Sequence, residues 1–462
     1  MKPKYFLALG LLVLGLGSCG ESFFEQYPSN NITEGNFYKT DDDFNQGVVA
    51  CYAKLKTQMS FHLTEIGYRG DENVLESMAV STQNRYDIDH FAETANNGIL
   101  NDIWNAWYNG IYRCNDVLDH MTGAKIANYD KYRGECLFLR SWWYFNLYRV
   151  FGVVPITRTV VTPAAAKLIP RCTEEEMYTL LTEDLAEAAR LLPPTPGPEK
   201  ARVANIAAYT LLAKVYLTFG KPAEAKTALE EAMKNTSYGL ESTTKKVFDV
   251  GNKMNREIIF ALYYNKTNDN GHGYWYSANT EVLADIRNPT PEFKAIYDGE
   301  KDNRLPLIST YTKISSNLFA MNKWYDTYDA TYTDQVGHDF PHLRYADVVL
   351  MYAEALAESG GSLGDALEWL NKTRTRAGLD ELTTDEVKSL AEFRRELADE
   401  RGREFALEGH RWFDLVRLGL AVDYFRGLGY SLDAHNLIFP IPQSQIEIVN
   451  NPSILWQNPG FN

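Results

Sequence analysis

Two stretches in the middle of the chain combine aromatic rings with amide, carboxylate and glycine residues. Tyr274, Trp275 and Tyr276 stand together in a glycine-rich stretch, and Trp324 and Tyr325 stand in a second stretch rich in Asp and Tyr. An aromatic ring presents a flat apolar face, and a neighbouring amide or charged group can form paired hydrogen bonds. Sugar rings need this combination, because their faces are apolar and their edges carry hydroxyls. We predict a carbohydrate-binding site here, with core packing of the rings as the alternative.

Four polar residues in an earlier stretch are the candidates for hydrogen bonds to such a ligand. They are Arg69, Asp71, Asn73 and Arg85. The stretch from 68 to 98 contains several Gly and Asn residues and little periodicity, which predicts a long loop. Long structured loops are often functional.

A charged stretch near the C-terminus contains carboxylates that could be taken for a catalytic pair. Glycoside hydrolysis uses two carboxyl groups. However, Glu408 with Arg411, and Asp414 with Arg417, have the spacing of ion pairs along a helix. We therefore expect structural ion pairs here, and not catalysis.

Other catalytic and cofactor signatures are missing from the sequence. It contains no G-x-S-x-G, no H-E-x-x-H, no Walker loop and no EF-hand loop, and its eight histidines show no ligand spacing. We predict that the protein is not an enzyme and has neither a cofactor nor a metal site. The Asp- and Asn-rich loops leave calcium binding as an open alternative.

Helical periodicity dominates the segments that must position these residues. Thr40 before three aspartates predicts a helix start and a helix over about 44–58. The stretch 99–121 has one apolar side, whereas 135–152 is apolar nearly all round and should pack between other helices. The four tryptophans in these two stretches are expected in the core; they are Trp104, Trp107, Trp142 and Trp143. From 237 to 341 the periodicity fades, and EIIFALYY (257–264) predicts a strand.

An internal repeat gives the fold class. Residues 212–232 and 352–370 both follow the tetratricopeptide pattern of small and large residues, with glycine at the turn. Small residues let two antiparallel helices approach closely. The predicted fold is mainly α-helical, a scaffold of tetratricopeptide-like hairpins with an irregular, loop-rich ligand region and a few short strands. The proline-rich tail, 439–462, is expected to be irregular surface chain.

The N-terminus reads as a lipoprotein signal. Lys2 and Lys4 precede an apolar run that is too short to span a bilayer, and Leu16-Gly17-Ser18 leads directly into Cys19. We predict a signal peptide over 1–18 and acylation of Cys19, which tethers the protein to a membrane. The other four cysteines, Cys51, Cys114, Cys136 and Cys172, show no metal spacing, and we favour buried thiols over disulfides.

The net charge of the chain restricts the classes of molecule that it is expected to bind. The 462-residue chain has a formal net charge of -15. An acidic protein has no electrostatic reason to bind nucleic acid or anionic lipid, so no nucleic-acid partner is expected.

The chain resembles the SusD/RagB family along nearly its whole length. The matching stretches occur in the family's order: Cys19, IYRCN, LFLRSWWYFNLYRVFGVVPI, RYADVVLMYAEALAESG, LNKTRTRAG, ERGREFALEGHRWFDLVRLG and FPIPQSQIEIVNNPSILWQNPGF. Gly402 departs from the pattern, because the family usually has a bulkier residue there. The resemblance implies a SusD-like helical domain over 19–236 and a RagB/SusD domain over 237–462.

The resemblance also implies a function. Members of this family are glycan- or peptide-capturing outer-membrane lipoproteins that act as lids of TonB-dependent SusC-like channels. We therefore expect a protein that is anchored at the outer membrane, faces the cell exterior, and binds an oligosaccharide or polysaccharide for import. The alternatives are a peptide-capturing RagB-like lipoprotein and, less favoured, a lipid-anchored helical glycoside hydrolase.

Overall fold

The computed structural model describes residues 37–67, 69–72, 83–197, 200–264, 277–278, 289–315, 318–324 and 338–461. The chain divides into a short unit, residues 1–46, and a large unit, residues 47–462. In the short unit, the hydroxyl and backbone N–H of Thr40 donate to Asp43 at 2.8 and 2.7 Å. These bonds cap α2 (Asp41–Gly67), which begins near the predicted place and runs further than predicted.

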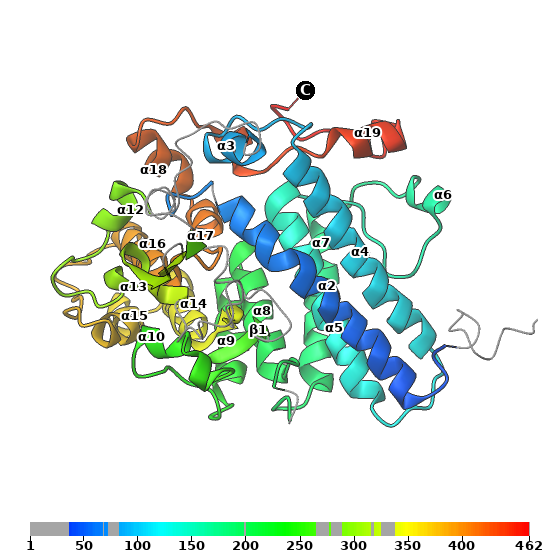
Figure 1. The fold of residues 1–462 in the computed structure, drawn as a ribbon, viewed down its shortest axis with the longest axis horizontal. Helices are drawn as coiled ribbons and strands as arrows, with labels where there is room; N and C mark the ends of the chain where they lie inside the picture. The colour runs from blue at the N-terminus through cyan, green and yellow to red at the C-terminus, as the bar shows by residue number, and fades with distance from the viewer. Residues whose placement is uncertain are drawn as a thin grey trace, which may run out of the picture. The chain divides into compact units, whose positions relative to one another are not determined.

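Long helices make up most of the large unit and follow each other in an array (Figure 1). In chain order they are α4 (Gly98–Met121), α5 (Tyr129–Phe151), α7 (Glu174–Leu191), α8 (Asn205–Thr218), α9 (Pro222–Met233), α14 (Tyr345–Glu358), α15 (Leu363–Arg376) and α16 (Leu390–Phe405). From α4 to α15 each of these helices packs against the next, and α16 packs against both α14 and α15. Among the described residues, no helix combines the length and the apolar composition needed to span a bilayer.

Shorter helices and turns complete the large unit. They are α3 (Gln83–Asp89), α6 (Pro163–Ala166), α10 (Thr244–Val247), η3 (Val250–Asn252), α12 (Pro291–Ala295), α13 (Leu305–Ser309), η5 (Asn322–Trp324), α17 (Arg411–Arg417), α18 (Ala421–Gly427), η6 (Ala434–Leu437) and α19 (Gln443–Val449).

The two predicted repeats are helical hairpins, which confirms the mainly α-helical, tetratricopeptide-like fold. One hairpin is α8 with α9 and the other is α14 with α15. Gly220 and Gly360 lie in their turns with φ of +66° and +83°, a conformation that favours glycine. Helix α14 packs on α9, so the two hairpins are neighbours although they are far apart in sequence. Because α9 and α14 lie on either side of residue 236, the proposed boundary there stays a prediction.

Helix α5 lies between α4, α7 and α8, as its apolar composition predicted. The four predicted core tryptophans are all buried. Cys51, Cys114, Cys136 and Cys172 are buried free thiols.

Two small sheets accompany the helices. Strand β1 (Ile258–Leu262) confirms the predicted strand and pairs antiparallel with β5 (Phe340–Arg344). The second sheet has the order β2-β4-β3, formed by β2 (Ser277–Ala278), β3 (Tyr311–Ser315) and β4 (Leu318–Met321).

The C-terminal tail differs from the expected irregular surface chain. It contains the short helix α19, and Phe439 and Ile441 are fully buried. The backbone N–H of Phe439 donates to the Val150 carbonyl at 2.8 Å, and Gln443 N–H donates to Ala95 at 2.8 Å. The tail is therefore fixed to the helical array, because its apolar residues enter the core and its backbone groups find partners there.

Candidate functional site

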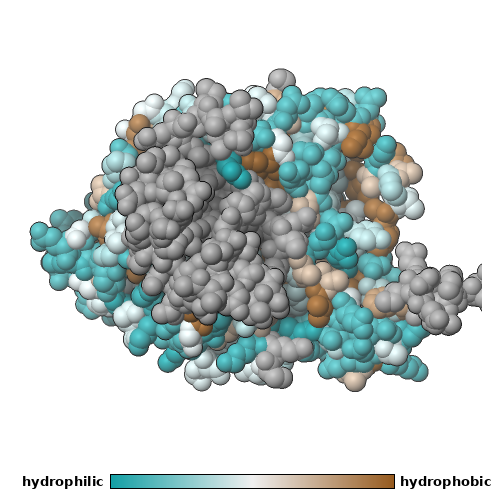
Figure 2. Space-filling model, viewed as in Figure 1, coloured by the Kyte–Doolittle hydropathy of each residue, from teal (hydrophilic) through white to brown (hydrophobic). Residues whose placement is uncertain are grey.

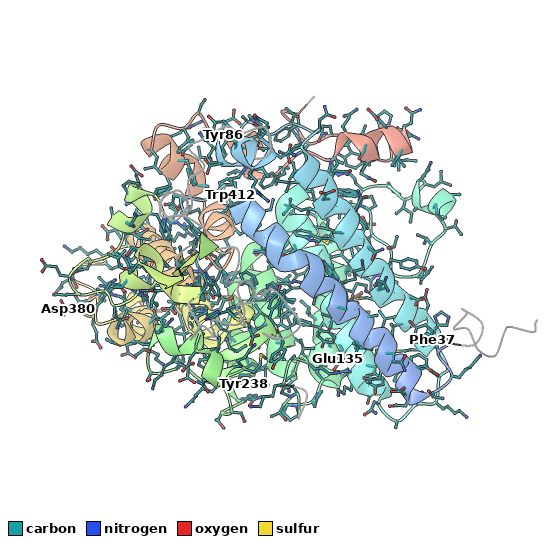
Figure 3. The ribbon with its side chains drawn as sticks, viewed as in Figure 1. Phe37, Tyr86, Glu135, Tyr238, Asp380 and Trp412 are labelled. Carbon is teal, nitrogen blue, oxygen red and sulfur yellow. The ribbon has the colours of Figure 1, made fainter. Side chains whose placement is uncertain are left out.

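Arg69 is a core residue, contrary to its expected role as a ligand contact. Its guanidinium pairs with Glu93 and donates to the Asn436 carbonyl, and it lies 3.7 Å from the ring centre of Phe439. It also lies 5.2 Å from the ring of Trp412, which is labelled in Figure 3. Arg69 therefore joins the start of the predicted loop to the C-terminal part of the chain, and its burial leaves it closed to a ligand.

Asp71 is also engaged inside the protein. Its carboxylate accepts hydrogen bonds from Arg411 at 3.2 Å and from the Tyr424 hydroxyl. This pairing raises the pKa of the Arg411 guanidinium above its ordinary value. Asp71 is almost fully buried, so the structure corrects its expected role in binding.

Trp324 was expected to be an exposed platform, and the structure places it in the core. It is fully buried, and its ring centre lies 5.1 Å from that of Phe248 and 6.3 Å from that of Phe340. Apolar neighbours on both sides make burial favourable for this ring. Arg85 lies on α3 and is half-buried. The remaining expected residues lie outside the described part of the chain; they are Cys19, Asn73, Tyr274, Trp275, Tyr276 and Tyr325.

The described ends of the predicted ligand segments come together in space. Glu72 accepts a hydrogen bond from the Leu407 N–H at 3.0 Å, and the Thr290 N–H donates to the Asp71 carbonyl at 3.4 Å. Lys323 pairs with Glu408 at 2.8 Å. Residues 71–72, 290 and 323 thus meet around the turn between α16 and α17. Sequence reasoning found the segments but had no signal for this common anchor.

The turn is held by a buried network of ion pairs. Arg344 contacts Glu408 at 2.9 Å, Glu404 at 2.7 Å and Glu257 at 2.8 Å. Neighbouring guanidinium groups hold the pKa of Glu404 well below its usual range. In the part of the chain that is described, no cluster of three or more His, Cys, Asp or Glu residues suits a metal ion.

The ion pairs confirm one of the two predicted pairings. Asp414 pairs with Arg417 at 2.8 Å, whereas Glu408 and Arg411 have other partners, Arg344 and Asp71. Glu408 and Arg411 have long-range partners because a turn separates α16 from α17, so the two residues do not lie on one continuous helix. A Cβ at Gly402 would lie 3.1 Å from Arg411 Nη1 and 3.1 Å from Ile296 Cδ1, so glycine here gives both side chains room.

A second concave site was not expected from the sequence. A cavity of about 380 Å³ between α4, α6 and α19 is lined by Trp104, Tyr108 and Tyr112, with the amides of Asn105 and Gln445 beside them. Figure 2 shows apolar atoms among hydrophilic ones in this area, at the right of the view. Tyr112 is 45% exposed. The i, i+4, i+8 spacing of these rings was visible in the sequence but could not distinguish a core stripe from a lined groove.

Two family models match the chain. One is described as the SusD family and matches residues 297–461; the other is described as starch-binding associating with outer membrane and matches residues 27–217. The chain belongs to the SusD/RagB family.

One relative within this family is similar along nearly the whole chain, and another is similar over part of it. SusD-like protein P2 of Formosa agariphila is 26% identical, over 99% of this chain and 100% of its own length. The starch-binding protein SusD of Bacteroides thetaiotaomicron is 38% identical over 140 residues, which are 29% of this chain and 23% of SusD. A solved structure of a laminarin-binding SusD-like protein has a TM-score of 0.75 and 25% identity, and covers 92% of this chain and 100% of its own. In this SusD/RagB chain, the family models leave residues 218–296 unmatched, the range that contains Tyr274 to Tyr276.

Proposed function

We propose that the protein is a glycan-binding lipoprotein of the outer membrane, facing the cell exterior, that captures an oligosaccharide or polysaccharide for a SusC-like TonB-dependent channel. The observation that carries this proposal is membership of the SusD/RagB family together with named starch-binding and laminarin-binding relatives. The protein acts by binding and not by catalysis.

The proposed ligand contacts are the aromatic and amide residues that the sequence singles out in the stretches after residue 72, before residue 290 and after residue 324. They are Asn73, Tyr274, Trp275, Tyr276 and Tyr325, with Arg85 on α3. Rings stack on the apolar faces of a sugar, and amides pair with its hydroxyls. The buried ion pairs under the α16–α17 turn support this assignment, because they give the segments fixed ends.

The first experiment is isothermal titration calorimetry with a panel of polysaccharides and a parallel panel of peptides. We expect binding to at least one glycan and none to the peptides. Trp275→Ala should weaken glycan binding by about tenfold or more, as loss of a central aromatic contact does. Trp369→Ala is the matched control, because Trp369 packs on Tyr352 in the α14–α15 hairpin and should keep full affinity.

Three further outcomes distinguish the alternatives. If Trp275→Ala binds normally and Tyr112→Ala does not, the ligand occupies the cavity between α4, α6 and α19, and the proposed contacts are wrong. Binding of peptides without glycans would favour the RagB-like alternative. Release of reducing sugar from a bound glycan would overturn the non-catalytic assignment.

A further inference from the structure

A cavity of about 460 Å³ opens between the C-terminal end of α5, helix α8 and helix α17. This volume lies within the range of small-molecule sites. Its walls combine the rings of Phe145, Tyr148 and Phe413 with the cationic side chains of Arg149 and Lys214. None of the described residues that the sequence pointed to as ligand contacts lines it. The cavity is therefore a separate feature of the molecule.

A balanced set of ion pairs lies beside this cavity. Lys214 contacts Asp347 at 2.5 Å, Arg401 contacts Asp347 and Asp414 at 2.8 Å each, and Arg417 contacts Asp414 at 2.8 Å and also Glu354. Three cations thus face three carboxylates. Burial and the nearby Lys214 lower the pKa of His410 well below its ordinary value, so His410 adds no charge at neutral pH.

Arg149 adds a fourth cation that this set does not neutralise. Its guanidinium carbon lies 4.0 Å from the ring centre of Phe413 and 4.7 Å from that of Phe145, and it donates to the amide oxygen of Asn146. Within the described ranges, no carboxylate forms an ion pair with Arg149, and its buried Nε–H has no hydrogen-bond partner. Burial lowers the pKa of Arg149 to about 9, although the carboxylates of Asp414 and Asp347 act in the opposite direction.

We propose that this cavity binds the carboxylate of a sugar acid, with Arg149 as its charge partner. A guanidinium holds a carboxylate through two parallel hydrogen bonds, and the anion would give Arg149 the direct ion-pair partner that it lacks among the described residues. The Phe413 and Phe145 rings supply apolar walls for the sugar carbons. Choosing a sugar as the carrier of the carboxylate rests on the proposed glycan-binding function, whereas the anion site does not.

The other polar groups at the cavity favour a singly charged ligand with hydroxyls. The Tyr148 hydroxyl donates to the exposed carboxylate of Glu174 at 2.9 Å, and both residues line the cavity. A carboxylate at this position accepts hydrogen bonds from sugar hydroxyls. Glu174 and Asp414 also repel negative charge, so a monoanion suits the site better than a dianion such as inorganic sulfate.

The test is isothermal titration calorimetry of the whole protein with D-glucuronate, D-glucose and sodium sulfate. We expect saturable binding of glucuronate and none of glucose or sulfate. Arg149→Gln should lower the affinity for glucuronate by about tenfold or more, because a charge-assisted pair is lost. Arg158→Gln is the matched control, since Arg158 is exposed and pairs with Glu183 at 2.9 Å; it should bind as the wild type does.

A second variant tests the cavity with Arg149 left in place. Thr218 lines the cavity from α8, and its hydroxyl donates to the Lys214 carbonyl of the same helix at 2.8 Å. Thr218→Leu should fill part of the space and weaken glucuronate binding, while the far-ultraviolet circular dichroism stays that of the wild type. The proposal is overturned if the wild type does not bind glucuronate, if Arg149→Gln binds equally well, or if sulfate binds in place of glucuronate.

The test of the anion site can fail or succeed independently of the test of the proposed glycan-binding function. Arg149→Gln should still bind any neutral polysaccharide that the wild type binds. If the wild type binds glucuronate through Arg149 but no polysaccharide, the anion site stands and the glycan-binding function fails.

Discussion

At the scale of single residues, Glu72 is a buried carboxyl that lacks an ion pair in the described part of the chain. It accepts a hydrogen bond from the N–H of Leu407, which has a φ of +63°. A left-handed conformation is costly for leucine, so an acceptor for its N–H helps to hold the turn between α16 and α17. Burial raises the pKa of Glu72 to about 8.

This raised pKa predicts a pH-dependent gain in stability for Glu72→Gln. In the unfolded chain the carboxyl loses its proton near its ordinary pKa, whereas in the folded protein it keeps the proton up to about pH 8. The wild type therefore loses stability between about pH 5 and pH 8. Glutamine keeps the acceptor for Leu407 without the charge, so the variant should match the wild type near pH 5. It should exceed the wild type by up to about 4 kcal/mol above pH 8.

Urea unfolding at several pH values checks this prediction. Glu300→Gln is the control, because Glu300 is exposed and its substitution should leave the free energy of unfolding close to that of the wild type. A difference between Glu72→Gln and the wild type that stays constant from pH 5 to pH 9 would contradict the argument.

The sequence identified residue types better than residue environments. The aromatic and polar composition of a sugar site was visible, but Arg69, Asp71 and Trp324 proved to be buried. Their burial depends on partners such as Glu93, Arg411 and Phe248, which lie far away in sequence or on other elements. Local patterns do not contain such contacts, and so they could not separate a ligand residue from a framework residue.

At the scale of elements, the apolar pattern was sufficient to predict the hairpins and the burial of α5, because both follow from residues within single helices: a repeated pattern in the hairpins, and an apolar surface nearly all round in α5. The same pattern did not predict that α17 is a separate helix or that the C-terminal tail is partly buried. The spacing of Glu408 and Arg411 fits one continuous helix, whereas a turn separates α16 from α17 and sends the two residues to different partners. The close approach of α4 and α5 was also hidden, since it depends on one glycine.

That glycine leads to a prediction for Gly110→Ala. A Cβ at Gly110 would lie 2.2 Å from Cε2 of Trp143, a fully buried ring that has no room to move. The two helices would have to separate, which costs about 1–3 kcal/mol. Thermal unfolding should show a lower midpoint for this variant.

Gly427→Ala is the matched control, because the added Cβ meets no atom within 4 Å and Gly427 is not in the left-handed region. Its midpoint should stay within a degree or two of the wild type or rise slightly. Equal midpoints for the two variants would show that α4 and α5 do not pack as closely as described.

At the scale of the whole molecule, the residues that hold the fold together are different from the residues that we propose contact the ligand. Most of the helical array and its ion pairs lie in the ranges that the family models match, whereas the proposed ligand segment with Tyr274, Trp275 and Tyr276 falls between those ranges. Asn73, Arg85 and Tyr325 lie within the matched ranges. The same framework can thus present different ligand residues in different relatives. This is also why the family was evident from the sequence, whereas the identity of the glycan was not.

Delivery to a channel requires that capture takes place at the membrane, and the proposed anchor at Cys19 makes this testable. Cys19→Ala should abolish labelling by palmitate and move the protein to the soluble fraction. Glycan binding by the purified variant should be unchanged, because the described framework contains its own core. Growth on the bound glycan should fall, since a released protein would no longer stay near the proposed channel.

A second cysteine variant separates anchoring from general damage. Cys172→Ala removes a buried free thiol of the large unit and should leave both labelling and fractionation as in the wild type. If Cys19→Ala stayed in the membrane and supported normal growth, the protein would have to be held by something other than a lipid on this cysteine. In that case the proposed tether would be wrong while the glycan-binding framework would stand, because the two depend on different parts of the chain.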